Sequence, residues 1–298
     1  MGRSQVIDLD GPVHYVDHGG EGRPLVLIHG LGGSHLNWMA VADALTAHHR
    51  VYALDLAGFG LTPLSGRRAT LTRNRCLIDD FISGMGFDSP VTLAGNSMGG
   101  LLVMMQAAVA PETVAAAILV TPALPPVRPI KIDKYAVTRL ALPILPFVGP
   151  AYVRRIRNAA PVAQQVDTML DMLCVDSERL SDEIRAATLA MAQRRLHMEW
   201  AIPSFVAASR SIVWLLARRS RVRSIVDQIA CPVLVIQGEQ DVIVPPQAAR
   251  WLQERRPDFV FEFFPDAGHV PQMETPAEFV AAVERFLSRI SVPAGSEP

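Results

Sequence analysis

The sequence predicts an α/β protein with a mostly parallel, doubly wound sheet and one inserted helical segment. Short apolar runs alternate with longer segments of helical periodicity. Several of the short runs are continuous in Val, Ile and Leu, which indicates strands buried on both faces of a parallel sheet. The alternation stops between about 124 and 218, where the chain reads as helical and is punctuated by proline. With hydrophobic residues at 50% of 298, the chain can form a core of this size.

The elements follow from the periodicity of each segment. Two alternating polar–apolar segments around Gly11–Pro12 are typical of an edge hairpin. Strands are then predicted at 24–30, 50–58, 90–97, 115–122, 232–238 and 259–268. Helices are predicted at 37–47, 73–85, 98–110, 246–255 and 276–290. The last helix carries one apolar stripe, formed by Phe279, Val283, Phe286 and Ile290.

This alternation divides the chain into a core and an insertion. We expect a core at 1–122 and 222–290, a helical cap at 123–221, and a disordered tail at 291–298. Charge differs between the parts, because 121–223 holds sixteen Lys and Arg against eight Asp and Glu, and the remainder twelve against twenty-one. The excess is explained either by solvated, Arg-rich helix faces or by a basic lid that faces an anionic surface or substrate.

Composition also bears on location and partners. The net charge of −1 gives no signal for nucleic acid. Three cysteines, none in a Cys-x-x-Cys pattern, are expected as reduced thiols. The first twenty residues lack the apolar centre of a signal peptide, and no uncharged apolar run reaches the about 18 residues of a membrane span. We therefore expect a cytoplasmic protein. Any contact with a membrane is expected to be peripheral and to involve the basic cap.

Ser97 lies between glycines at the junction of a predicted strand and a predicted helix. Residues 95–99, "GNSMG", fit G-x-S-x-G in the context that gives this motif meaning. A sharp turn there lifts the serine above the sheet, and Gly95 and Gly99 remove side chains that would collide with backbone. The alternative is a tight packing turn in which the serine is incidental.

A serine nucleophile needs a base, and the base needs an orienting group. Among eight histidines, His269 follows the last strand and so lies at the same sheet edge as Ser97. The strand at 232–238 leads into Glu239 and Asp241, and we favour Asp241 as the orienting carboxylate, with Glu239 as the weaker candidate. The histidines in hairpin, helix or cap patterns are expected to be structural or exposed: His14, His18, His48, His49 and His197.

An oxyanion site requires two backbone N–H donors. Met98 follows the nucleophile directly, and Leu31 lies in the loop "HGLGG", where Gly30 and Gly32 permit a close backbone approach. We expect His29 to brace this loop by a hydrogen bond and to take no catalytic proton. The alternative is an ordinary strand-to-helix turn.

Together these motifs resemble those of the α/β-hydrolase family over roughly 4–122 and 222–290. The resemblance is carried by His29–Gly30–Leu31–Gly32, "DLAGFGLT" at 55–62, "GNSMGG" at 95–100, "GEQDVIVP" at 238–245 and "DAGHVPQMETP" at 266–276. It implies the α/β-hydrolase fold and an intact triad of Ser97, Asp241 and His269. Ala57 and Phe59 depart from the residues that relatives often carry, and Phe59 is expected to make the pocket mouth more apolar.

The resemblance implies a serine esterase of the lipase-like branch that needs neither metal nor organic cofactor. Serine at position 97 argues against the epoxide-hydrolase and haloalkane-dehalogenase branches, which use Asp there. The apolar cap suggests small-molecule ester or lipid substrates with acyl chains of medium length. "GNSMGG" is also similar to the hydrolases that cleave a C–C bond in vinylogous diketo acids, for which Arg194 or Arg195 of the cap could bind a carboxylate. A third reading is a ligand receptor on the same fold.

Overall fold

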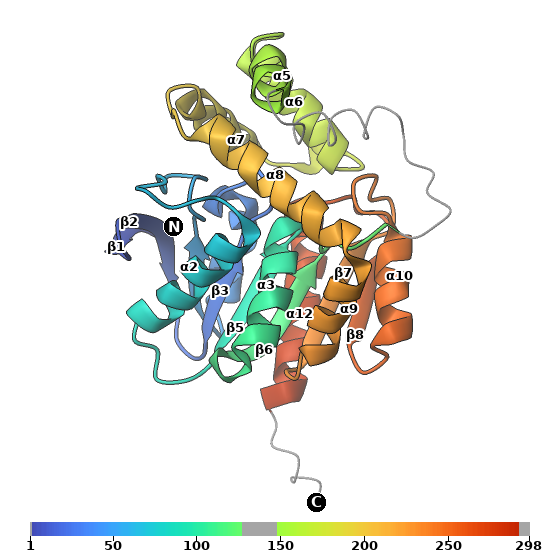
Figure 1. Cartoon of the computed structure of the whole chain (residues 1–298). Coiled ribbons are helices and arrows are strands. Elements are labelled where there is room, and N and C mark those ends of the chain that lie inside the picture. The colour runs from blue at the N-terminus through green and yellow to red at the C-terminus, as the bar shows by residue number, and fades with distance from the viewer. Residues whose placement is uncertain (1, 127–147, 292–298) are drawn as a thin grey trace, which may run out of the picture.

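A computed structural model of the chain describes residues 2–126 and 148–291. These residues form one eight-stranded sheet in the order β1-β2-β4-β3-β5-β6-β7-β8, with helices on both faces (Figure 1). β2 runs antiparallel to both of its neighbours, and all pairings from β4 to β8 are parallel. The predicted edge hairpin and doubly wound sheet are thereby confirmed. The strands are Arg3–Asp8, Pro12–Gly19, Pro24–Ile28, Arg50–Leu54, Val91–Asn96, Val114–Val120, Val233–Gly238 and Val260–Phe264.

The central strands are apolar because both faces of the sheet are covered. Every residue of β5 and of β7 is buried, as continuous Val, Ile and Leu runs predict. One core lies between the sheet and α2 (Leu71–Gly84), α3 (Met98–Val109), α9 (Arg219–Gln228) and α10 (Pro246–Arg255). The second core lies under α1 (Ala42–Leu45) and α12 (Pro276–Ser291). The stripe predicted for α12 packs into this second core.

The helix predicted at 37–47 is wrong as a single element. A 3₁₀ turn, η1 (His35–Trp38), comes first, and α1 begins only after Val41. Ser34 sets the early start, because its side chain accepts from the Leu36 N–H and Asn37 bonds back to the Ser34 N–H as a capping box. The break also lets Trp38 and Val41 both reach the core, where each is fully buried.

Between β6 and α9 the described chain is largely helical and lies over one edge of the sheet (Figure 1). We call α5 to α8 the cap helices: α5 (Val148–Arg157), α6 (Val162–Leu173), α7 (Asp182–Arg195) and α8 (Ala201–Ala217). The short η4 (Ser177–Arg179) joins α6 to α7, which pack against each other. The expected boundary at 221–222 falls inside α9, which packs on α3. Part of the expected cap, 127–147, lies outside the described residues.

Two further observations concern the chain ends and membranes. α12 extends to Ser291, so the expected tail would begin one residue later, and 292–298 lie outside the described residues. No helix in the described parts is long and apolar enough to cross a bilayer. Since β3 to β8 are parallel, the loops that follow them all meet at the edge beneath the cap helices.

Candidate active site

Ser97 occupies a strained turn between β5 and α3. Its backbone has φ 56° and ψ −112°, a region that costs a non-glycine residue about 1–3 kcal/mol. The end of β6 holds the turn in place, because the Ser97 N–H donates to the Val120 carbonyl at 2.9 Å and the Ala123 N–H donates to the Ser97 carbonyl at 3.0 Å. The surrounding fold therefore imposes a conformation that an isolated chain would avoid.

The flanking glycines make this turn sterically feasible. A Cβ on Gly95 would lie 2.3 Å from the carbonyl carbon of Gly99. A Cβ on Gly99 would lie 2.3 Å from the carbonyl oxygen of Ile28 in β3. Both clashes are with backbone atoms, of α3 for Gly95 and of β3 for Gly99, so a side chain at either position would force the strand and the helix apart. The role predicted for these two glycines is confirmed.

His269 and Asp241 form a buried hydrogen-bonded pair. The His269 Nδ1 lies 2.8 Å from the Asp241 Oδ2. The other carboxylate oxygen, Oδ1, accepts from the Ile243 N–H at 2.8 Å and the Val244 N–H at 2.9 Å. Since a carboxylate only accepts, the Nδ1–H of His269 is the donor to Asp241, and in the neutral imidazole Nε2 is then the nitrogen that carries the lone pair. Glu239, the weaker candidate, instead binds the exposed Arg250 at 2.7 Å.

The main chain of His269 is fixed from two directions that the sequence did not reveal. Its carbonyl accepts from the Asn96 side-chain amide at 3.0 Å and from the Thr121 hydroxyl at 2.9 Å. Its N–H donates to the carbonyl of Leu173, at the end of α6, at 2.7 Å. Asn96, which precedes Ser97, and Leu173 of the cap therefore both hold the main chain of His269. A polar Asn inside an otherwise apolar strand was the available signal.

The loop after β3 adjoins Ser97. A Cβ on Gly30 would lie 3.4 Å from the Ser97 Cβ, so the two backbones approach closely there. His29 binds the loop on both sides of its ring: its Nδ1 donates to the Gly30 carbonyl at 2.7 Å, and its Nε2 accepts from the Leu56 N–H at 3.1 Å. Burial lowers the pKa of His29 to about 4, which keeps the imidazole neutral at pH 7.

A buried carboxylate with two histidines lies beside this loop, and it was not anticipated. The Asp55 Oδ2 lies 2.8 Å from the His14 Nδ1, 3.0 Å from the His35 Nδ1 and 2.8 Å from the Leu61 N–H. Its Oδ1 accepts from the His35 N–H at 2.7 Å. Burial raises the pKa of Asp55, but the hydrogen bonds from both histidines outweigh burial and leave the pKa below its usual value.

This cluster is the one group among the described residues whose spacing would suit a metal ion. Its donors and acceptors are already matched, because His14 also reaches the Ser4 hydroxyl through Nε2 at 2.8 Å. Metal binding would require both Nδ1 atoms to lose the protons that now bond to Asp55. We therefore describe it as a hydrogen-bond network that anchors the loops after β3 and β4.

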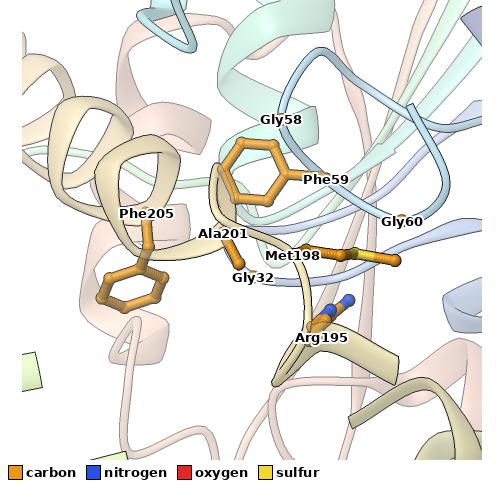
Figure 2. A pocket seen from close by; sticks show the side chains of 8 residues that line it. All are labelled: Gly32, Gly58, Phe59, Gly60, Arg195, Met198, Ala201 and Phe205. Carbon is orange, nitrogen blue, oxygen red and sulfur yellow. The ribbon is translucent and has the colours of Figure 1, made fainter. Parts of the chain in front are cut away.

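A cavity of about 80 Å³ lies between the cap and the core loops. Figure 2 shows Phe59 beside Ala201 and Met198, with Arg195 below Met198. Ser97 is not part of its lining, and the cavity reaches the loop after β3 through Gly32. The lining comprises Gly32, Gly58, Phe59, Gly60, Arg195, Met198, Ala201 and Phe205.

Of the two candidate arginines, only Arg195 faces this cavity. Its Nη2 donates to the Gly33 carbonyl at 2.7 Å, whereas Arg194 is exposed. Burial lowers the pKa of Arg195, and Asp55 acts in the opposite direction. Among the described residues no carboxylate forms an ion pair with Arg195. The bond to the Gly33 carbonyl is the one hydrogen bond of its guanidinium among those residues.

Comparison with known proteins places the chain in a family. The model of the alpha/beta hydrolase family matches residues 25–283. The chain is 26% identical to 2-hydroxy-6-oxo-6-(2'-aminophenyl)hexa-2,4-dienoic acid hydrolase of Metapseudomonas resinovorans, over 91% of this chain and 86% of that protein. It is 28% identical to pimeloyl-[acyl-carrier protein] methyl ester esterase of Aeromonas salmonicida, over 91% and 98%.

Solved structures agree with this assignment at the level of the fold. A thermophilic esterase from Thermogutta terrifontis superposes with a TM-score of 0.74 at 24% identity, over 97% of this chain and 100% of that one. The family match covers the parallel part of the sheet, from β3 to β8, and the loops that carry Ser97, Asp241 and His269. The chain belongs to the alpha/beta hydrolase family and is an enzyme of the hydrolase class.

Proposed function

We propose that this enzyme hydrolyses carboxylic esters through an acyl-enzyme on Ser97, with His269 as the base and Asp241 as its orienting carboxylate. The observation that carries the proposal is the 2.8 Å pair between the His269 Nδ1 and Asp241, located at the same sheet edge as the strained Ser97 turn. The Leu31 and Met98 N–H groups are the proposed oxyanion donors. Neutral His29 holds the Leu31 loop and takes no proton.

The proposed reaction proceeds in two halves. The Ser97 Oγ attacks the ester carbonyl carbon while His269 Nε2 takes the hydroxyl proton, and the oxyanion is stabilised by the two N–H donors. The C–O bond to the alcohol then breaks, and the alcohol leaves with the proton from Nε2. Water attacks the acyl-enzyme while giving a proton to Nε2, the acid leaves, and Ser97 regains its proton. Asp241 stays ionised throughout and holds the imidazole in the required tautomer.

The cavity supports a preference for acyl chains of medium length. Its side chains from Phe59, Met198 and Phe205 are apolar, and apolar surface favours hydrocarbon over polar acyl groups. A series of nitrophenyl esters from acetate to octanoate measures this, and we expect kcat/KM to peak between butyrate and octanoate. A kcat/KM that is highest on acetate and declines steadily would contradict the preference.

Arg195 favours a second candidate function, the hydrolysis of a C–C bond in a vinylogous diketo acid. Such a substrate carries a carboxylate, and a largely buried guanidinium beside the loop after β3 is a suitable partner for one. One of the relatives reported above acts on a dienoic acid of this kind. The same Ser97 and His269 would serve both reactions, so only substrate choice separates the candidates.

One experiment separates the candidate functions. Wild type, Ser97→Ala, Arg195→Met and the matched Arg194→Met are assayed on a neutral aryl ester and on a dienol diketo acid. Ester hydrolysis that needs Ser97 and is unchanged within about twofold in both arginine variants supports the esterase. Efficient turnover mainly of the diketo acid, with KM raised about tenfold by Arg195→Met alone, supports the C–C hydrolase. Absence of any Ser97-dependent turnover would favour a ligand receptor.

We also propose peripheral contact with anionic lipid at the corner between α8 and α9. Trp214 is 59% exposed there, and the Arg218 guanidinium lies 3.4 Å from the centre of its ring. Arg219, Arg221 and Arg223 are exposed just beyond it. Trp with basic residues is the composition of an interfacial anchor. Cosedimentation should show binding to anionic vesicles that Trp214→Ala weakens, and equal, negligible binding to anionic and neutral vesicles would exclude the contact.

A further inference from the structure

We propose that Glu274 is a positioning residue that joins the cap to the His269 loop, so that the seating of the cap sets the position of the base. The inference rests on the proposed function only in that His269 is taken as the base. Glu274 ends α11 (Pro271–Glu274) and is 3% exposed. A buried carboxylate must be matched by donors, and its donors come from two separate parts of the chain.

The two oxygens of Glu274 bind opposite sides of this junction. The Oε1 accepts from the Val175 N–H at 2.7 Å and the Asp176 N–H at 3.0 Å, both in the segment that follows α6 of the cap. The Oε2 accepts from the Gly268 N–H at 2.8 Å, in the residue that precedes His269. One carboxylate thus fixes the cap segment and the His269 loop to each other by charge-assisted hydrogen bonds.

Neighbouring contacts reinforce the same junction. The next amide along the loop, His269 N–H, donates to the Leu173 carbonyl of the cap at 2.7 Å. A Cβ on Gly268 would lie 2.6 Å from that same carbonyl, so the two backbones touch directly. Arg179 of the cap donates to the Asp266 carbonyl at 2.8 Å and lies 3.9 Å from Glu274. Two consecutive amides of the His269 loop therefore depend on the cap segment or on Glu274.

An apolar cluster surrounds the polar junction and belongs to both parts. It joins side chains of α6, α7 and the segment between them to Val270 and Met273, on either side of the start of α11. At the far end of α7, Arg195 donates to the Gly33 carbonyl. The α6–α7 hairpin thus contacts the proposed base at its turn, through Leu173, and the loop of the proposed oxyanion site at the C-terminal end of α7. A shift of this hairpin would move both.

The physical consequence concerns alignment, because Glu274 touches neither Ser97 nor the imidazole. Without its carboxylate the Gly268 N–H loses its partner, and the His269 backbone keeps only its other bonds. A displacement of about 1 Å at a catalytic group can cost on the order of a hundredfold in rate. We therefore expect loss of Glu274 to lower kcat even for a substrate too small to reach the cap.

The kinetic test compares Glu274→Gln with Glu262→Gln. The glutamine at 274 keeps the shape but has one acceptor oxygen, so either the Gly268 or the Val175–Asp176 end is released. Glu262 pairs with the exposed Arg285 at 3.1 Å and serves as the control. We expect Glu274→Gln to lower kcat for nitrophenyl acetate about ten- to a hundredfold, with KM within about twofold. A lower Tm with unchanged kcat on acetate would overturn the proposal.

A second measurement reads the junction without turnover, so failure of the proposed function does not affect it. Glutamine releases only one end directly, but hydrogen exchange should accelerate at both ends in Glu274→Gln, at Gly268 and His269 and at Val175 and Asp176, because each segment holds the other in place. In the reverse direction, Arg179→Gln removes the bond from the cap to the Asp266 carbonyl and leaves the partners of the Gly268 and His269 amides in place, and it should accelerate exchange at both amides. Exchange that changes in the cap alone in both variants would show that the two parts are not coupled and would overturn the proposal.

Discussion

The side-chain amide of Asn96 donates a hydrogen bond to the main-chain carbonyl of His269 at 3.0 Å, which joins the residue before the nucleophile to the proposed base. Asn96→Ala removes this bond and leaves the Thr121 hydroxyl as the remaining donor. We expect kcat to fall about tenfold and the free energy of unfolding to fall by about 1–3 kcal/mol. Ester kinetics and urea unfolding measure both, with the exposed Asn158→Ala as control. Unchanged kcat would show that the Thr121 bond alone suffices.

Gly99 tests the steric requirement of the Ser97 turn. Gly99→Ala places a methyl group 2.3 Å from the Ile28 carbonyl, and we expect a loss of stability of about 3 kcal/mol or more together with loss of activity. Gly86 has φ 63° with open space around its Cβ position, so Gly86→Ala should cost only the backbone term, about 1–2 kcal/mol. Chemical unfolding compares the two. Equal costs would mean that the turn can relax.

His29 makes stability depend on acidity. Burial lowers the pKa of His29 to about 4. Between pH 6.5 and 4 this histidine is therefore protonated in the unfolded chain but stays neutral in the folded chain. Stability from this group is therefore complete above pH 6.5 and is lost as pH falls through that window, by up to about 3 kcal/mol. The difference in unfolding free energy between pH 7 and pH 5 should shrink in His29→Gln. An unchanged difference would assign the acid sensitivity to other groups.

Asp55 and Asp43 offer a matched pair of aspartates that each bind histidine. Asp55 is buried and accepts four hydrogen bonds, whereas Asp43 binds His18 at 2.7 Å and is 56% exposed at its side chain. Asp55→Asn replaces one acceptor oxygen by an NH2 group that faces N–H donors. We therefore expect the free energy of unfolding to fall by about 3 kcal/mol or more. Asp43→Asn should cost less than about 1 kcal/mol. Thermal and urea unfolding at pH 7 give both values, and a small loss at Asp55 would argue against the network.

Local pattern predicted the parts of this molecule that local interactions determine. The continuous apolar strands and the glycine-flanked turn at Ser97 follow from burial and sterics within a few residues. Asp241 was favoured over Glu239 by its place in the loop, and the structure pairs it with His269. The helix at 37–47 failed because a capping box at Ser34, rather than apolar periodicity, sets where the chain turns.

Several contacts between distant segments, unlike the Asp241–His269 pair, could not be predicted from the sequence pattern. His14, His35 and Asp55 converge from separate elements, and nothing in their spacing predicts a shared hydrogen-bond network. Arg194 and Arg195 could not be separated, because adjacent residues of a helix point about 100° apart and only tertiary packing decides which faces inward. The bonds from Glu274 to Val175 likewise depend on how the cap is seated.

The attachment of the α6–α7 hairpin at its turn and at the end of α7 has a consequence for protein engineering. A chimera that receives this hairpin from another hydrolase would still have main-chain N–H groups at 175 and 176, but a different turn would place them differently against Glu274. The bond to the Gly33 carbonyl would be lost wherever the grafted hairpin has no arginine at position 195. Grafts that transfer α6 and α7 together with positions 268–274 should therefore retain turnover more often than grafts of the hairpin alone. The set of residues that must be exchanged together to transfer substrate specificity would then be larger than the insertion, and would include part of the core.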